Sequence, residues 1–362
     1  MFLHWKTAPP ASKNPGLKKP VIRVIYGEPG QARHLFFNSA GSSPVPEEKP
    51  SGRRHSFAKI IYLVLGLTIF AGGGYFLGKQ QVPQKQLFSP AVWEGRVLGM
   101  NLWYPGTVNR GNSLAPDITA KAAYFVDIDS GQVLYQKNAD VKLPIASLTK
   151  IMTVTVTLAH HKFSDTIQVS NFAASIEPDH MGLIPGEKLL VEELLYGVFL
   201  SSANDAAEAL AENIPGGRSK FISEMNEISL QLGMNDTKFI NPTGLEEDGK
   251  TQYSTALDVA LMSRYLVKQY PEVTQISRTY HVYLPPTSTH QAYDLYSGIN
   301  LLTTYPGVIG LKIGYTPEAG LTIVTLAKRG SHEVLGVILN SDDRRQEARE
   351  LLDYSFKKLG EI

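Results

Sequence analysis

The sequence predicts an α+β fold in which one sheet is assembled from strands near both ends of a folded region and is covered by helices. Two observations lead to this prediction. Apolar runs with strand character lie at residues 122–138 and again at 307–340, whereas the residues between them show helical periodicity. Strands at both ends of a helical block are typical of a sheet built from the two ends of the domain.

Composition places the chain among ordinary globular proteins and excludes several kinds of site. Of its 362 residues, 43% are hydrophobic and 19% are charged, which is enough for one large domain or two modest ones. The chain has no cysteine. A disulfide framework, a thiolate zinc site and a cysteine nucleophile are therefore all excluded.

The basic residues are over-represented at the N-terminus. Residues 1–59 contain 10 of the 35 Lys and Arg residues but only 3 of the 34 Asp and Glu residues, which leaves 25 basic and 31 acidic residues in the remainder. The N-terminal part is therefore basic and the rest is acidic. We expect the two parts to face different surroundings.

An apolar run follows the basic part. Residues 60–77 carry no charge and are long enough to cross a bilayer, and we predict a transmembrane helix at 59–78. Arg53, Arg54 and Lys59 precede this run, which by the positive-inside rule keeps the N-terminus in the cytoplasm. A cleaved signal peptide is the alternative, but more than fifty residues precede the apolar run and no clear cleavage site follows it.

The predicted span divides the chain into four parts. Residues 1–58 are rich in Pro, Gly, Ser and Lys without periodicity, which predicts a disordered cytoplasmic tail. Its positive charge either holds it against anionic lipid or serves only as a topology signal. Residues 79–115 are predicted to be an extracytoplasmic linker and residues 116–362 the folded domain. We therefore expect a single-pass protein of the cell membrane whose folded domain lies outside the cytoplasm.

The folded domain is predicted to begin with a hairpin and a long helix. The apolar runs at 122–128 and 132–138 flank the turn-forming sequence DSG, which predicts a β-hairpin. Pro144 then bends the chain, and apolar residues at helical spacing follow from Ser147 to the histidine pair at 160–161.

The middle of the domain is predicted to be helical and its end to alternate strands. The helical pattern is interrupted by the polar break SSAN and by the turn cluster NPTGL. Three strand-like runs come next, and an amphipathic pattern closes the chain. The predicted helices are 192–200, 205–213, 220–232, 254–269 and 342–359, and the predicted strands are 307–316, 320–330 and 332–340.

Ser147 and Lys150 form the first candidate catalytic pair. At a helical spacing of three residues their side chains share a face. A serine hydroxyl is a poor nucleophile, but an amine beside it can take its proton if burial and neighbouring positive charge lower the pKa of that amine toward neutrality. A helix N-terminus at Ser147 also favours developing negative charge. Such a pair is more often a helix cap and a solvated lysine, so the assignment depends on the other motifs.

Two later motifs supply polar groups that such a pair can use. Ser202 and Asn204 lie in the break between two helices, where a polar loop can face a cleft, although either residue can instead cap the following helix. Lys312 lies in a predicted strand, and Gly314 follows it and allows another chain to approach the backbone closely. The alternative for Lys312 is protection of a sheet edge, the usual role of an isolated strand lysine.

The order of these motifs resembles that of the penicillin-binding serine peptidases and serine β-lactamases: SxxK at Ser147, SxN 55 residues later and KxG 110 residues further on. The surrounding sequence resembles the low-molecular-weight D-alanyl-D-alanine carboxypeptidases, serine peptidases of S11 type, over residues 118–355. This resemblance implies a β-lactamase/DD-peptidase-like transpeptidase fold, with an antiparallel sheet from both chain ends and a helical subdomain. The similar blocks are ASLTKIMT, LLVEELLYGVFLSSANDAAEALAENI, FISEMNEISLQLGM, TKFINPTGL, YSTALDVALMS and GVIGLKIGYTPEAG.

The resemblance implies a role for each motif residue. Ser147 would attack the carbonyl of the penultimate D-alanine of a peptidoglycan stem peptide, and Lys150 would take its proton. Ser202 would relay that proton to the departing D-alanine, while Asn204 would orient Lys150 and the substrate amide. Lys312 would attract the terminal carboxylate and keep the pKa of Lys150 low. β-Lactam antibiotics would acylate Ser147 as covalent inhibitors.

The third motif departs from the family pattern. The family normally has threonine between the lysine and the glycine, whereas this chain has Ile313. The change removes a hydroxyl that in relatives points toward the substrate carboxylate, and a hydrogen bond to a charged group is worth roughly 1.5 to 3 kcal/mol. We therefore expect weaker carboxylate recognition unless Thr316 substitutes. By position, the backbone N–H groups of Ser147 and Tyr315 would bind the oxyanion, beside Gly314.

The activity implied by the resemblance is that of a serine-type D-Ala-D-Ala carboxypeptidase that needs no cofactor. Three alternatives stay open: a DD-endopeptidase, a β-lactamase, which is less favoured because no convincing ExxLN-type stretch is found, and a peptidoglycan-binding homologue impaired by Ile313. The nine histidines show no HExxH or comparable spacing, so no metal site is expected. No Gly-rich phosphate loop or basic, aromatic face suggests nucleotides or nucleic acid as partners.

Overall fold

The computed structural model describes residues 105–106 and 115–362. The predicted tail at 1–58, the predicted transmembrane helix at 59–78 and nearly all of the predicted linker lie outside these residues. Within the described part of the chain, no helix combines the length and apolar character that crossing a membrane requires.

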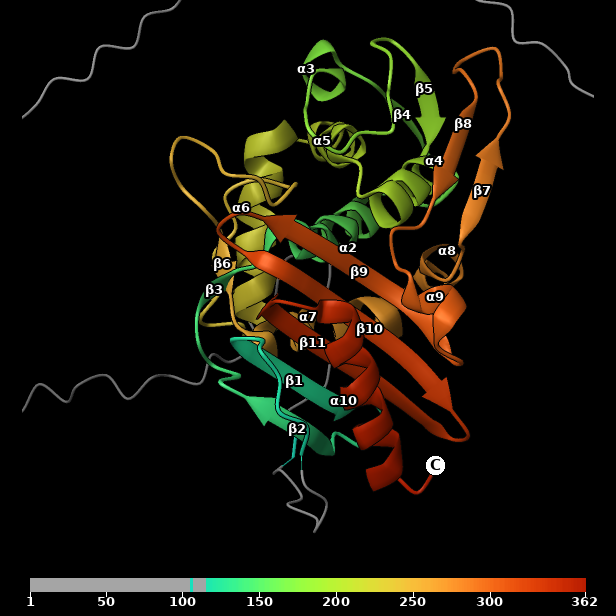
Figure 1. The fold of residues 1–362 in the computed structure, drawn as a ribbon. Coiled ribbons are helices and arrows are strands. Elements are labelled where there is room, and N and C mark those ends of the chain that lie inside the picture. The colour runs from blue at the N-terminus through green and yellow to red at the C-terminus, as the bar shows by residue number, and fades with distance from the viewer. Residues whose placement is uncertain (1–104, 107–114) are drawn as a thin grey trace, which may run out of the picture. The chain divides into compact units, whose positions relative to one another are not determined.

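A five-stranded antiparallel sheet is the centre of the domain (Figure 1). Its strand order is β2-β1-β11-β10-β9, so the first two strands of the domain pair with the last three. The prediction of an α+β domain with a sheet from both ends is confirmed. The strands are β1 (Ala122–Asp127), β2 (Val133–Lys137), β9 (Val308–Thr316), β10 (Gly320–Arg329) and β11 (His332–Ser341).

Alternation along β1 places apolar side chains on both faces of the sheet. Tyr124 and Val126 belong to the apolar cluster that includes the central helices, whereas Phe125 belongs to a second cluster with helix α10 (Arg344–Lys358). Gly336 of β11 lies opposite Phe125, and a Cβ there would come within 2.2 Å of the phenylalanine ring. The sheet is therefore buried between two helical layers, which explains why all of β1 is buried.

The helical layer opposite α10 is organised around α2, whose first nine residues are all buried. Three of the buried residues of α2 are threonines, and the hydroxyls of Thr155 and Thr157 donate to carbonyl oxygens of their own helix, Ile151 O and Thr153 O. These bonds satisfy the polar groups and allow the helix to lie in the core. The main helices of this layer are α2 (Lys150–His160), α4 (Val191–Tyr196), α5 (Asn204–Glu212), α6 (Gly217–Gln231) and α7 (Ala256–Gln269).

Several short elements were not predicted because they are too short to show a periodic pattern. Most of them are two-stranded sheets or single helical turns at the periphery of the helical layer (Figure 1). They are β3 (Leu143–Pro144) with β6 (Tyr253–Ser254), β4 (Thr166–Gln168) with β5 (Lys188–Leu190), β7 (His281–Leu284) with β8 (Tyr293–Tyr296), α3 (Asn171–Ala174), α8 (Val273–Ser277) and α9 (Leu301–Thr304).

Candidate active site

Ser147 lies in a tight turn directly before the central helix. The segment Ala146–Thr149 forms one 3₁₀ turn and α2 begins at Lys150, so the prediction that Ser147 itself opens the long helix is wrong by one turn. Two glycines allow the backbone to pack closely around Ser147. A Cβ on either Gly244 or Gly314 would lie 2.9 Å from Ser147 N, which is too close for a side chain.

The Lys150 amine is fully buried and is surrounded by three oxygen atoms. Its Nζ lies 3.0 Å from Ser147 Oγ, 2.6 Å from Asn204 Oδ1 and 2.7 Å from the carbonyl oxygen of Thr243. The alternative in which this lysine is solvated is therefore wrong. The serine and the amine are at hydrogen-bond distance, and two further acceptors hold the amine in place.

The surroundings of Lys150 lower its pKa to about 7, and burial of the amine is the cause. The carboxylates of Asp179, Glu208 and Asp205 oppose this effect, because negative charge favours the protonated amine. An amine with this pKa is substantially neutral near pH 7, and only the neutral form can accept a proton from Ser147.

Lys312 is the second buried lysine of the site. Its Nζ donates to Ser202 Oγ at 2.8 Å and to the carbonyl oxygen of Ile313 at 2.9 Å. The lysine is 0% exposed, so the interpretation that it protects a sheet edge is wrong. Burial, followed by the charges of Lys150 and Arg344, holds the pKa of Lys312 well below its usual value.

The break between α4 and α5 presents Ser202 and Asn204 to the two lysines. Ser202 has a positive φ of 61° and follows a π-helical turn, and Asn204 is the first residue of α5. The N-cap position of α5 is Ala203, and no side chain caps this helix, so the interpretation of Ser202 or Asn204 as caps is wrong. Asn204 also bonds the preceding loop, donating from Nδ2 to Pro178 O and from its backbone N to Asp179 O.

The end of β9, the edge strand of the sheet, carries the remaining predicted residues. Tyr315 is 61% exposed, and Thr316 Oγ1 accepts a hydrogen bond from Ala319 N within the following turn. Ile313 is partly buried against the α10 cluster, and its Cδ1 lies 2.8 Å from where a Cβ on Gly298 would be. The isoleucine at the position of the usual threonine therefore takes part in apolar packing.

The structure brings the predicted site residues together from three separate segments of the chain. Ser147, Lys150 and Asn204 form one hydrogen-bonded group, and Ser202 and Lys312 form a second. Among the described residues, no group of three or more His, Asp or Glu side chains could hold a metal ion.

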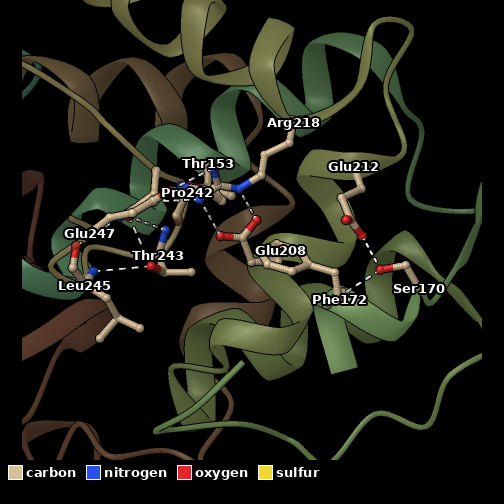
Figure 2. Close-up of polar contacts among 12 residues, drawn as sticks. Thr153, Ser170, Phe172, Glu208, Glu212, Arg218, Pro242, Thr243, Leu245 and Glu247 are labelled. Atoms are coloured by element: carbon tan, nitrogen blue, oxygen red, sulfur yellow. Dashed lines mark hydrogen bonds and ion pairs between the residues drawn. The ribbon is translucent and has the colours of Figure 1, made fainter. Parts of the chain in front are cut away.

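One contributor to this site was interpreted only as a turn in the sequence. The cluster NPTGL carries Thr243, whose carbonyl oxygen bonds Lys150, and the carbonyl oxygen of Pro242 accepts from Thr153 Oγ1 of α2 at 2.6 Å (Figure 2). Asn241 Oδ1 accepts from the backbone N–H groups of Thr243 and Gly244 and so fixes the turn. An asparagine and a glycine three residues apart signal such a turn, but not its contact with a distant lysine.

Arg344 is a second contributor that the sequence did not indicate as part of the site. Its Nη1 donates to the carbonyl oxygens of Gly314, at 2.6 Å, and Thr322, at 3.3 Å, so it lies against β9 and β10 beside the third motif. Nothing in the sequence near residue 344 distinguishes it from the other charged residues of the final amphipathic helix.

An antiparallel sheet covered by helices, with a serine, a buried amine at hydrogen-bond distance from it and a second buried lysine on its edge strand, is the arrangement of the penicillin-binding serine peptidases. The profile of the D-alanyl-D-alanine carboxypeptidase family, peptidase S11, matches residues 109–343 of the chain. The chain belongs to this family.

Curated relatives support the assignment. The chain is 37% identical over 247 residues to the D-alanyl-D-alanine carboxypeptidase DacF of Bacillus subtilis, a match that covers 66% of this chain and 62% of that protein. It is 31% identical over 259 residues to the D-alanyl-D-alanine carboxypeptidase of Streptomyces sp. strain K15, covering 67% of this chain and 88% of that protein. The chain thus spans less than two thirds of the length of the Bacillus relative.

Solved structures share the fold. The Streptomyces K15 DD-transpeptidase superposes with a TM-score of 0.63 at 29% identity, covering 68% of this chain and 100% of that one. A D-alanyl-D-alanine carboxypeptidase from Mycobacterium tuberculosis H37Rv superposes with a TM-score of 0.64 at 29% identity, covering 70% of this chain and 96% of that one.

Proposed function

We propose that the protein is a serine-type D-Ala-D-Ala carboxypeptidase that removes the terminal D-alanine from peptidoglycan stem peptides. The observation that carries this proposal is the arrangement around Lys150 Nζ, which lies 3.0 Å from Ser147 Oγ and is buried with a lowered pKa. A protein that only binds peptidoglycan has no need of a buried amine at hydrogen-bond distance from a serine.

The hydrogen bonds of Lys150 support its role as the base. A neutral amine has two N–H groups and one lone pair. Asn204 Oδ1 and the carbonyl oxygen of Thr243 accept hydrogen bonds from this amine, which accounts for both N–H groups of the neutral form. The lone pair is then left for the third neighbour, the hydroxyl of Ser147.

The proposed reaction proceeds through an acyl-enzyme. Ser147 Oγ forms a bond to the carbonyl carbon of the penultimate D-alanine while its proton passes to the neutral Lys150 amine. The amide C–N bond then breaks, and the proton reaches the leaving amine of the terminal D-alanine with the help of Ser202. Water attacks the ester, releases the shortened peptide and returns a proton to Ser147 Oγ. The backbone N–H groups of Ser147 and Tyr315 stabilise the oxyanion in both steps.

Cationic groups beside the third motif support recognition of a terminal carboxylate. The amine of Lys312 donates to Ser202 Oγ, and Nη1 of Arg344 donates to the carbonyl oxygen of Gly314. The charge of Arg344 favours an anionic group at the exposed end of β9, where Tyr315 and Thr316 lie, and such an anion would in turn favour the protonated form of Lys312. We propose that the substrate carboxylate binds there, and that Ile313 weakens this binding because it supplies no hydroxyl.

Covalent labelling of the full-length chain with a fluorescent penicillin tests the nucleophile. We expect labelling of the wild type and of Ser201→Ala, and none of Ser147→Ala. Ser201 is a suitable control because it lies in the same site region but donates to Gly197 O within its own helical turn. A folded wild type that is not labelled would contradict the proposal and favour an inactive peptidoglycan-binding protein.

Digestion of purified muropeptides tests the reaction. Free D-alanine from monomeric pentapeptides is the expected product. Cleavage of cross-linked dimers without free D-alanine would instead identify a DD-endopeptidase, and rapid turnover of the bound penicillin would identify a β-lactamase.

We further propose that residues 59–78 anchor the protein in the cell membrane, with the N-terminal tail in the cytoplasm and the catalytic domain outside. The proposal rests on the uncharged run at 60–77 and the basic residues before it. Because the chain contains no cysteine, single cysteines introduced at residues 40 and 85 can be labelled individually in intact cells with a membrane-impermeant maleimide. Labelling at 85 alone is expected, whereas labelling at 40 would contradict the topology.

A further inference from the structure

Arg218, near the start of α6, joins the carboxylates of Glu208 and Glu247 next to the segments that form the candidate active site. It bonds Glu208 at two points, from Nε to Oε2 at 2.9 Å and from Nη2 to Oε1 at 3.1 Å. It also bonds Glu247 at two points, from Nη1 at 3.2 Å and from Nη2 at 2.7 Å. Figure 2 shows the arginine between Glu208 and the segment that carries Thr243.

The two carboxylates belong to the two segments that hold Lys150. Glu208 lies on α5, one helical turn after Asn204, whose Oδ1 accepts from the Lys150 amine. Glu247 lies four residues after Thr243, whose carbonyl oxygen is the other acceptor. Arg218, on α6, therefore connects helix α5, which carries one acceptor, to the loop that carries the other.

We propose that Arg218 is a positioning residue for Lys150: through Glu208 and Glu247 it clamps together the two segments whose oxygens orient the amine toward Ser147. This proposal rests on the proposed acyl transfer at Ser147. A planar guanidinium suits the role because its five N–H donors have a fixed geometry and can engage two carboxylates at once. Arg218 is not a catalytic residue, since its contacts are to Glu208, Glu247 and the ring of Phe172, and not to the reacting atoms.

The clamp is largely removed from solvent at its α5 end. The side chain of Glu208 is 3% exposed, whereas that of Glu247 is 40% exposed. Burial raises the pKa of Glu208 and the hydrogen bonds from Arg218 counteract this effect. If the arginine is removed, a buried carboxylate is left without its partner, and α5 is free to shift or to admit water.

Other contacts keep the fold together without the clamp. Thr153 of α2 bonds the carbonyl oxygen of Pro242, and Asn241 fixes the turn from within. A variant at Arg218 is therefore expected to fold, with altered contacts around Lys150.

The charges that face Lys150 set the direction of the effect. Asp179 in the preceding loop, with Asp205 and Glu208 on α5, favours the protonated amine. Lys312 on β9 is the facing basic group, whose own pKa is held low by burial and by the charges of Lys150 and Arg344. Water at the amine would reduce the effect of burial, and an unpaired Glu208 would add negative charge. Both changes raise the pKa of Lys150 above about 7, whereas protonation of the unpaired Glu208, whose pKa burial raises, would act in the opposite direction.

The test compares the full-length wild type with Arg218→Met, which keeps most of the side-chain volume, and Glu247→Gln, which weakens only the link to the turn. The first measurement is the titration of Lys150 by ¹³C NMR of lysine-labelled protein, with Lys150→Gln used to assign the signal. The second is the rate of acylation by a fluorescent penicillin from pH 5 to 9. We expect the pKa of Lys150 and the acidic limb of the rate profile to move up by about one unit in Arg218→Met, which is about a tenfold loss of rate below neutral pH. Glu247→Gln should show a smaller shift in the same direction.

Lys268→Met is the matched control. Lys268 also joins two carboxylates, those of Asp129 at 2.6 Å and Glu333 at 3.3 Å, but these lie in other segments than the acceptors of Lys150. Its profile should match the wild type even if its melting temperature falls.

An unchanged pKa of Lys150 in both Arg218→Met and Glu247→Gln would contradict the proposed positioning role of Arg218, whatever the stability of the two variants. If Arg218→Met does not fold, Glu247→Gln decides, because it retains the bond between Arg218 and Glu208. If the wild type is not acylated at any pH, the proposed function fails, and the NMR titration still tests the clamp.

Discussion

Acylation of Ser147 is expected to titrate with the buried amine of Lys150. Burial lowers the pKa of Lys150 from 10.5 to about 7, so the amine loses its proton as the pH rises through the neutral range. In the proposed mechanism the neutral amine is the form that takes the proton of Ser147. The rate of acylation should therefore rise with pH and level off above neutrality, which is the opposite of what a protonated lysine acting as an acid would give.

The size of the effect follows from the same value. With a pKa of about 7, about half of the molecules carry a neutral Lys150 at pH 7. Below pH 6 this fraction falls about tenfold for each pH unit, so about one molecule in a hundred is competent at pH 5. An ordinary exposed lysine, with a pKa near 10.4, would be neutral in fewer than about one molecule in a thousand at pH 7.

The assay is the second-order rate constant for labelling by a fluorescent penicillin between pH 5 and 9, with circular dichroism recorded at each pH to show that the protein stays folded. Lys150→Arg is the control, because a guanidinium keeps its proton throughout this range. This variant should be labelled at least a hundredfold more slowly at every pH, and its rate profile should show no change of slope near pH 7. A wild-type rate that does not change between pH 5 and 8, or a Lys150→Arg variant with the wild-type profile, would refute the reasoning.

Three further substitutions test the site. Asn204→Asp keeps the acceptor for Lys150 but adds a negative charge at the atom 2.6 Å away, so the acidic limb of the labelling-rate profile should move to higher pH. An acidic limb at or below the pH of the wild type would contradict this expectation. Gly314→Ala places a methyl group 2.9 Å from Ser147 N. The labelling rate should fall at least tenfold, and the free energy of unfolding should fall by about 1 to 3 kcal/mol. A wild-type labelling rate would show that β9 can move aside. Ile313→Thr should bind a D-Ala-D-Ala peptide and be acylated by it about tenfold or more better than Ile313→Val, which has the same shape without the hydroxyl. Equal rates would show that no hydroxyl is needed there.

The resemblance of local blocks in the sequence is what identified most of the candidate site. Ser147 and Lys150 are three residues apart, and their proximity follows from helical geometry alone. Ser202, Asn204 and Lys312 share no such local relation with them, so their association rested on the similarity to a family. The usual role of a strand lysine, protection of a sheet edge, was the wrong interpretation for Lys312, because exposure of a strand residue depends on what packs over it.

The contributors that were missed have their effect through tertiary contacts. Thr243 acts through its backbone carbonyl, which every residue possesses, so no side-chain pattern distinguishes it. Arg218 and Arg344 are ordinary charged residues of helices, and their importance depends on which carboxylates and carbonyls the fold places within reach of them.

The sequence by itself determined the class of the fold, the order of the main helices and strands, and the motif residues, because periodicity, turn residues and motif spacing are local properties of the chain. Only the tertiary structure decided that both lysines are buried, that the 241–245 turn holds Lys150, that Ile313 is partly buried against the α10 cluster and that Arg218 joins the two segments around the amine. These properties depend on contacts between residues far apart in the sequence, such as Ser202 and Lys312, which are 110 positions apart. Burial and neighbouring charge set the pKa of an amine, and both arise only when distant segments pack together.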